Sequence, residues 1–146
     1  AISRRLHCNR TKQMTSKVTY LGDLRTSSIH LQSGSEIISD APLENNGKGE
    51  AFSPTDTVAN ALASCMFTVM GIKARDLEVD FSNSTAEVTK IMGTDPRRIT
   101  EILVTFDMNI TVSEKDKTIL ERTAMTCPVF NSLHPDIKKE VVFNWK

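Results

Sequence analysis

Two cysteines, Cys65 and Cys127, are the side chains best suited to covalent chemistry in this sequence. They lie 62 residues apart, so they form neither a Cys-x-x-Cys redox motif nor a zinc-ligand pair of short spacing. A thiol becomes a nucleophile when it ionises, which a nearby cation or a helix N-terminus favours. Cys127 directly precedes Pro128, a position that suits the start of a helix, where peptide dipoles favour a thiolate. A Cys-Pro step is equally compatible with a simple turn.

The surroundings of Cys65 are apolar, with Ala61 and Val69 four positions away on either side. Such a cysteine is usually a small hydrophobic core residue, and burial alone would raise its pKa and make it inert. Reactivity needs a cation directed at the sulfur. Arg25 begins a predicted strand after the Gly22-Asp23 turn and could reach across a sheet, although an arginine at a strand end is usually solvent-facing. Asp56 has a sufficient structural role as a helix cap.

No metal or cofactor is expected. His30 lies on an alternating strand and His134 at a helix exit, and both are typical surface residues. Together with two separated cysteines they do not make a metal site. The third cysteine, Cys8, lies in a basic N-terminal segment, and we interpret it as incidental.

The elements that must position these side chains follow from the hydrophobic pattern. A Ser-Pro-Thr-Asp sequence at 53–56 has the chemistry of a helix start, and the helix is expected to run to about Arg75. Residues 42–50 read as a loop. The alternating segments predict strands at 17–21, 25–32, 36–39, 77–81, 85–92, 99–112 and 137–145, and further helices are expected at 113–125 and 128–133. This order indicates an α+β fold with an N-terminal antiparallel meander, a central helix and a second sheet with a helix pair.

The central helix is apolar on every face, and such a helix must be buried on every side. A chain with few other helices cannot easily surround it. We therefore expect a second subunit to supply part of the cover, giving an obligate homodimer.

Composition excludes several classes of function. The 146 residues carry 18 basic and 18 acidic side chains, so the chain lacks the positive charge of a nucleic-acid or anionic-membrane binder. The longest apolar stretch, 58–72, is shorter than the roughly 20 residues that cross a bilayer. An odd count of three cysteines fits a reducing compartment, which predicts a cytoplasmic protein. Residues 1–13 are strongly basic and lack strand or helix periodicity; we expect them to be a disordered leader or tail, with a single domain over 14–146.

Three segments together resemble the OsmC/Ohr family of thiol hydroperoxide reductases. Residues 52–65, Phe-Ser-Pro-Thr-Asp-Thr-Val-Ala-Asn-Ala-Leu-Ala-Ser-Cys, are similar to the family's Asn-Pro-Glu-x-Leu…Ala-x-Cys helix. Residues 123–133, Thr-Ala-Met-Thr-Cys-Pro-Val-Phe-Asn-Ser-Leu, resemble its Cys-Pro-Val-Ser-x-x-Leu motif, and residues 20–26 resemble its arginine-bearing hairpin. The resemblance spans about 14–145 and implies an intertwined homodimer with two active sites at the subunit interface.

The resemblance assigns roles to three residues. Cys65 falls on the cysteine that attacks the peroxide, Cys127 on the resolving cysteine, and Arg25 on the arginine that stabilises the attacking thiolate. One position departs from the family, because Thr55 stands where a glutamate usually pairs with that arginine. Asp56 is about 100° further around the helix and is no simple substitute. Glu50, in the preceding loop, is the other candidate for that support.

The function predicted is a hydroperoxide reductase that uses a two-cysteine sulfenic acid and disulfide cycle, with an external dithiol as reductant. Apolar residues such as Met66, Phe67 and Phe130 would favour small organic hydroperoxides over hydrogen peroxide. Two alternatives remain open. In the first, which the Thr55 departure favours, the chain is a non-catalytic dimeric module that binds a small apolar ligand at the subunit interface. In the second, it is a purely structural dimeric domain with inert thiols.

Overall fold

The computed structural model describes residues 13–146, which divide into two compact units, one ending at Ser53 and the other spanning Pro54–Lys146. The expectation of a leader at 1–13 falls, apart from Gln13, outside the described residues. The expectation of a single domain over 14–146 stays a prediction.

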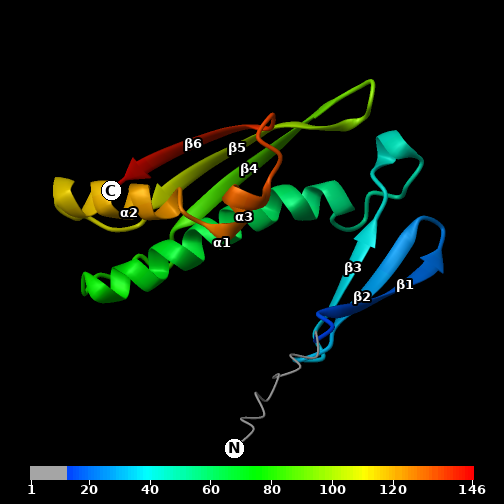
Figure 1. Cartoon of the computed structure of the whole chain (residues 1–146), viewed down its shortest axis with the longest axis horizontal. Coiled ribbons are helices and arrows are strands. Elements are labelled where there is room, and N and C mark those ends of the chain that lie inside the picture. Colours follow the sequence, from blue (N-terminus) through cyan, green and yellow to red (C-terminus); the bar gives the residue numbers. More distant parts are fainter. Residues whose placement is uncertain (1–12) are drawn as a thin grey trace, which may run out of the picture. The chain divides into compact units, whose positions relative to one another are not determined.

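The first unit is an antiparallel meander in the order β1-β2-β3 (Figure 1). Its strands are β1 (Ser16–Gly22), β2 (Arg25–His30) and β3 (Glu36–Asp40), followed by the short 3-10 helix η1 (Leu43–Asn45). The β1–β2 turn is tight, because Gly22, Asp23 and Leu24 all have positive φ angles. The meander predicted from sequence is therefore confirmed.

This three-stranded sheet buries little of its apolar surface. Nearly all of β1 is exposed, and so is most of β3. The large apolar side chains left exposed on the strands are Val18, Tyr20, Leu21, Ile37 and Ile38. Small sheets gain stability by packing an apolar face against another layer, so these side chains need a cover.

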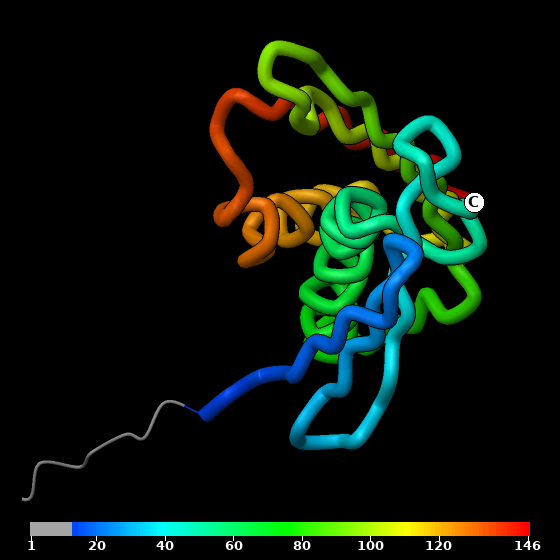
Figure 2. Tube along the Cα trace, turned by 90° about the vertical axis from the view of Figure 1, so that its right-hand side faces the viewer, coloured from blue at the N-terminus to red at the C-terminus, as the bar shows by residue number. Residues whose placement is uncertain are grey.

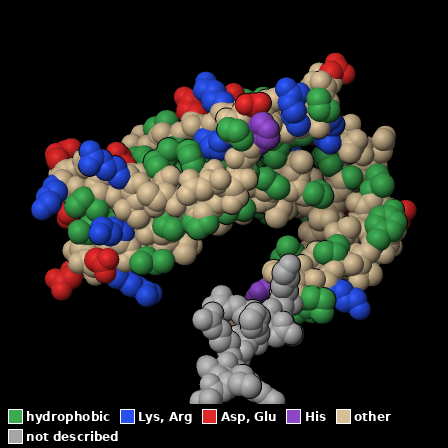
Figure 3. Space-filling view, in the orientation of Figure 1, with side chains coloured by type: hydrophobic (Ala, Val, Ile, Leu, Met, Phe, Trp, Pro, Cys, Tyr) green, Lys and Arg blue, Asp and Glu red, His purple; other side chains and the backbone are tan. Residues whose placement is uncertain are grey.

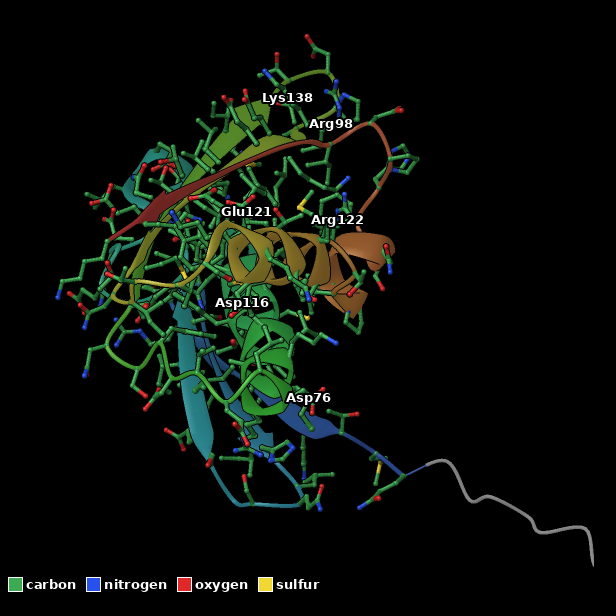
Figure 4. The ribbon with its side chains drawn as sticks, turned by 90° about the vertical axis from the view of Figure 1, so that its left-hand side faces the viewer. Asp76, Arg98, Asp116, Glu121, Arg122 and Lys138 are labelled. Carbon is green, nitrogen blue, oxygen red and sulfur yellow. The ribbon has the colours of Figure 1, made fainter. Side chains whose placement is uncertain are left out.

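The second unit places its helices on one face of a second three-stranded sheet (Figures 1 and 2). Strand order is β4-β5-β6, with β4 antiparallel and β6 parallel to β5. Arg98 and Lys138, near the starts of β5 and β6, lie at the same end of the sheet, as the parallel pairing requires (Figure 4). The elements are α1 (Pro54–Asp76), β4 (Thr85–Gly93), β5 (Arg98–Met108), α2 (Glu114–Ala124), α3 (Pro128–Ser132) and β6 (Lys138–Trp145).

The core of this unit lies between α1, α2 and the inner face of β5. Alternate β5 residues point inward and are fully buried, and Phe106 is the largest of them. Its ring lies 4.8 Å from that of Phe67 on α1 and 5.0 Å from that of Phe143 on β6, measured between ring centroids. Aromatic packing thus joins one helix and two strands that are distant in sequence.

One predicted strand is wrong. Residues 77–81 form turns and irregular backbone, with Glu78 at a φ of 56°. Leu77, Val79 and Phe81 alternate because they pack against the core, but neither sheet gives this segment a partner strand. The strand predicted at 99–112 also ends early, at Met108. The other predicted elements occur close to their expected bounds.

Within this chain helix α1 is buried on one side, and the cover expected from a second subunit on its other apolar faces stays a prediction. Its buried residues form one stripe at helical spacing: Ala59, Leu62, Ala63, Met66, Met70 and Ala74. Val58 is 40% exposed and Ile72 60% exposed, and hydrophobic side chains reach the surface of the second unit (Figure 3). The length and apolar composition of α1 are sufficient for a membrane-spanning helix. The core helix of a soluble protein meets the same two criteria.

Candidate functional site

Arg25 is the centre of a charged cluster in the first unit. It begins β2 directly after the left-handed turn, and the β2–β3 register places it opposite Asp40. Its Nη2 atom lies 3.1 Å from Asp40 Oδ2 and 2.7 Å from Glu50 Oε2. Glu50, one of the two candidates for supporting Arg25, forms an ion pair with it, and Asp40 is an acidic partner that sequence reasoning missed.

The loop after β3 delivers Glu50 to this cluster. Gly47 donates its N–H to the Pro42 carbonyl at 3.0 Å, and Gly49 donates to the Ala41 carbonyl at 3.1 Å, so the chain folds back on itself. A Cβ atom at Gly47 would lie 1.8 Å from the Ala41 oxygen, which excludes every other residue type from this backbone path. The glycines that suggested only a loop therefore determine where Glu50 lies.

The Asp40 carboxylate is completely buried, whereas its partner Arg25 is 31% exposed. Its Oδ2 atom accepts hydrogen bonds from Arg25 and from the Glu50 backbone N–H, which lies 3.1 Å away. The Glu50 N–H and the Arg25 guanidinium hold the pKa of Asp40 below its ordinary value, against the opposing effect of burial. Asp40 is therefore ionised at neutral pH.

This lowered pKa predicts a specific acid sensitivity. A carboxyl whose pKa is depressed by folding stabilises the native state above its unfolded pKa, about 3.9, and loses that contribution as pH falls through the folded value. We expect the free energy of unfolding, measured with urea, to fall more between pH 7 and pH 3.5 in the wild type than in Asp40→Asn. Glu44→Gln, an exposed change in the following loop, should keep the wild-type pH dependence. Equal pH dependence in all three proteins would contradict the assigned ionisation of Asp40.

Cys127 is the N-cap of α3, as its position before Pro128 suggested. Its Sγ atom accepts a hydrogen bond from the Phe130 backbone N–H at 3.2 Å. The thiolate that this position favours is opposed by the surroundings of the sulfur. Burial raises the pKa of Cys127, the neighbouring Cys65 raises it further, and the backbone N–H groups of α3 only partly offset the two. Cys127 is therefore a protonated thiol at neutral pH.

Cys65 lies on α1, half-buried against the core, on a stripe with Ala61 and Val69. It lies close enough to Cys127 to be one cause of the raised Cys127 pKa. Both thiols are free. The fold thus brings together two cysteines 62 residues apart in sequence, although their spacing alone gave no sign of it.

The first turn of α1 carries Asp56, which pairs with a lysine of the same unit. Lys90, on β4, lies 2.8 Å from Asp56 Oδ1 and donates a hydrogen bond to Thr55 Oγ1 at 2.9 Å. Its side chain is only 12% exposed, because it occupies an inward position in the alternation of β4. Sequence reasoning missed Lys90, although the same alternation places it on the core side.

The apolar residues named as possible pocket walls have different locations. Met66 is completely buried in the core, and Phe67 packs its ring against Phe106, so both stabilise the fold. Phe130 is partly buried beside Cys127, with the Lys139 ammonium 5.1 Å from its ring centroid. Of the three, Phe130 is the one whose backbone N–H donates a hydrogen bond to a cysteine sulfur. Over residues 13–146, no group of three or more potential ligands could hold a metal ion.

The arrangement has two chemical parts: a pair of interacting thiols on α1 and α3, and an arginine held by two carboxylates after β2. A family model described as OsmC-like protein matches residues 47–142, which include both cysteines and the α1 start. The chain belongs to the OsmC-like family. No functionally curated protein matches the sequence.

Solved structures of other OsmC-like proteins share the fold. A candidate osmotic stress induced and detoxification response protein of Psychrobacter arcticus 273-4 is 57% identical, with 90% of this chain and 96% of that chain covered and a TM-score of 0.88. An organic hydroperoxide resistance protein OsmC of Legionella pneumophila is 12% identical, with coverage of 90% and 97% and a TM-score of 0.70. An organic hydroperoxide resistance protein of Elizabethkingia anophelis is 13% identical, with coverage of 93% and 99% and a TM-score of 0.70.

Proposed function

We propose that this OsmC-like protein is a thiol-dependent hydroperoxide reductase with a preference for organic peroxides. The observation that carries the proposal is the proximity of Cys65 to Cys127, which is close enough to raise the Cys127 pKa. Two free thiols that lie near each other are candidates for a disulfide, which forms only when the Cα and Cβ atoms come within a narrow range of distances. Membership of the family and the fold shared with hydroperoxide resistance proteins support the same reaction class.

Cys65 is the attacking thiol and Cys127 the resolving thiol. The Cys65 thiolate attacks one peroxide oxygen, the O–O bond breaks, and the alkoxide takes a proton to leave as an alcohol, so that Cys65 becomes a sulfenic acid. Cys127 then condenses with it, giving a disulfide and one water molecule. An external dithiol reduces the disulfide and is itself oxidised. The raised pKa of Cys127 supports this division, because a protonated thiol does not compete for the peroxide.

Arg25 acts by charge. A guanidinium stays protonated over the working pH range, so it stabilises the Cys65 thiolate and the developing negative charge on the peroxide without transferring a proton. Glu50 and Asp40 hold it in place. Glu50 thereby fills the role of the glutamate that the family carries at the position of Thr55, while Lys90 engages Thr55 itself.

The active protein is a cytoplasmic homodimer in this proposal. The exposed apolar residues of the first sheet and the exposed Val58 and Ile72 of α1 are the surfaces that a second copy covers. A reducing compartment supplies the dithiol and keeps both cysteines free between turnovers. Light scattering at low micromolar concentration should give twice the chain mass of 16.2 kDa, and a monomeric mass would contradict the dimer.

Turnover with two peroxides tests the proposed reaction. With dithiothreitol as reductant, we expect consumption of cumene hydroperoxide at a higher kcat/KM than hydrogen peroxide, because an apolar wall such as Phe130 favours an alkyl tail. Equal rates for both peroxides would contradict the substrate preference. No turnover of either, with both thiols still reduced, would contradict the reductase and favour the module that only binds an apolar ligand.

A further inference from the structure

Asp40 carries a feature that a purely structural side chain does not need. Its carboxylate is completely buried, Oδ2 accepts two hydrogen bonds, and Oδ1 has no partner among the described residues. A buried carboxylate oxygen without a partner is destabilising. At the neighbouring cross-strand pair of β2 and β3, the side chains of Thr26 and Ser39 are uncharged hydroxyls that hydrogen-bond with each other. Strand pairing therefore does not require a buried charge at position 40.

We propose that Asp40 is the positioning residue of the reductase, which holds the Arg25 guanidinium in the orientation that stabilises the Cys65 thiolate. This inference rests on the proposed function, because it acts through Arg25. It goes beyond that function because it proposes that a buried carboxylate on β3, and not Glu50 alone, orients the Arg25 guanidinium. Asp40 itself does not touch the peroxide and is not a catalytic residue.

Hydrogen bonding at Arg25 shows how the positioning works. Asp40 and Glu50 both accept from the same nitrogen, Nη2, at 3.1 and 2.7 Å. A guanidinium has five N–H donors on three nitrogens, so within the first unit Nη1 and Nε keep theirs for other partners. Holding one corner of the planar group fixes its plane and directs the other donors. Those donors are the ones that we assign to the thiolate and the peroxide.

The two acidic partners differ in how firmly they can hold Arg25. The Glu50 side chain is 62% exposed, so water screens its ion pair and its side chain keeps conformational freedom. Asp40 is fixed on a strand, is fully buried, and has a pKa below its ordinary value. It also accepts the Glu50 backbone N–H, so it ties the loop that carries Glu50 to β3. One carboxylate thus fixes both the guanidinium and its second partner.

Positioning and simple charge balance predict opposite effects on the Cys65 pKa. If Asp40 were only a counter-ion, its removal would leave Arg25 a stronger cation, and the Cys65 pKa would fall. If Asp40 orients Arg25, its removal lets the guanidinium move, and the Cys65 pKa rises. The direction of the shift therefore distinguishes the two roles, which a loss of activity alone could not do.

The experiment measures the pH profile of iodoacetamide alkylation with Cys65 as the sole thiol, in a Cys8→Ser and Cys127→Ser background. Arg25→Ala, Asp40→Asn, the combination of both, and the control Glu44→Gln are compared. We expect Arg25→Ala to raise the Cys65 pKa by about 1–3 units, and Asp40→Asn to raise it by a smaller amount. The combined variant should match Arg25→Ala, because positioning has no effect without the group positioned. Glu44→Gln should leave the profile unchanged.

The outcomes distinguish a failure of the positioning role of Asp40 from a failure of the proposed function. No shift in Arg25→Ala would overturn the role of Arg25 and the positioning with it. A shift in Arg25→Ala with an unchanged or lowered Cys65 pKa in Asp40→Asn would overturn the positioning and leave the reductase intact. In the otherwise wild-type protein, Asp40→Asn should lower kcat by roughly 10- to 100-fold and change KM little. Should Asp40→Asn not fold by circular dichroism, Asp40→Ser takes its place, because a hydroxyl can still accept the Glu50 N–H.

Discussion

Replacing Cys65 with serine is expected to abolish hydroperoxide reduction, with a loss of at least about 10³-fold in kcat/KM. A serine hydroxyl is far less nucleophilic toward a peroxide oxygen than a thiolate and does not form a sulfenic acid. Cys65 is half-buried on α1, and serine is close to cysteine in size, so the fold should survive. Steady-state consumption of cumene hydroperoxide with dithiothreitol measures the effect.

Cys127→Ser is the matched variant for this prediction. It removes the other thiol of the pair but leaves the attacking one, so the first turnover should proceed and the disulfide should not form. Rapid mixing with a single equivalent of peroxide distinguishes the two variants: Cys127→Ser should consume peroxide and Cys65→Ser should not. The reverse result would exchange the attacking and resolving roles, and activity in both variants would contradict a two-cysteine cycle.

Replacing Arg25 with alanine should have the second largest effect, a fall of roughly 10²- to 10³-fold in kcat/KM at pH 7. Arg25 is the cation assigned to the Cys65 thiolate. Without it the thiol pKa rises and less of Cys65 is ionised at a given pH. Part of the lost rate should return as the pH is raised, because a higher pH restores the thiolate but not the contact with the peroxide. A pH–rate profile from pH 6 to pH 10 measures both parts.

Arg25→Lys and Arg97→Ala are the controls for that prediction. Lysine keeps the charge but not the planar group with its further N–H donors, so Arg25→Lys should lie between alanine and the wild type. Arg97 is exposed in the β4–β5 turn, and its removal tests whether any lost positive charge has the same effect. A pH–rate profile unchanged in Arg25→Ala, or an equal loss in Arg97→Ala, would contradict the electrostatic role of Arg25.

Local sequence signals predicted much of this fold because they coincide with burial in the structure. The α1 start at Pro54, the N-cap at Cys127 and the alternating β4 and β5 segments all occur as expected. Residues 77–81 show where the same reasoning fails, because their alternation reflects packing against the core rather than strand pairing. Periodicity reports which side chains are buried, and it does not report whether a partner strand exists.

Less of the candidate site could be predicted from the sequence, because contacts between residues far apart in the chain assemble it. Asp40 lies opposite Arg25 only through the β2–β3 register, which the turn around Gly34 could have predicted by counting back along both strands. The raised Cys127 pKa was missed because a helix N-terminus favours the thiolate while burial opposes it, and burial is a property of the folded chain. The pairing of the two cysteines came from the family resemblance, since 62 residues of spacing carry no such information.

Intact mass of the reduced protein after a single equivalent of cumene hydroperoxide tests the two-cysteine cycle most directly. The account predicts that the wild type loses two hydrogen atoms, which marks a Cys65–Cys127 disulfide, and that peptide mapping finds the crosslink between α1 and the start of α3. Cys65→Ser should keep its reduced mass, and Cys127→Ser should gain one oxygen. An unchanged wild-type mass, or oxygen added to methionines and scattered thiols without a disulfide, would contradict the cycle.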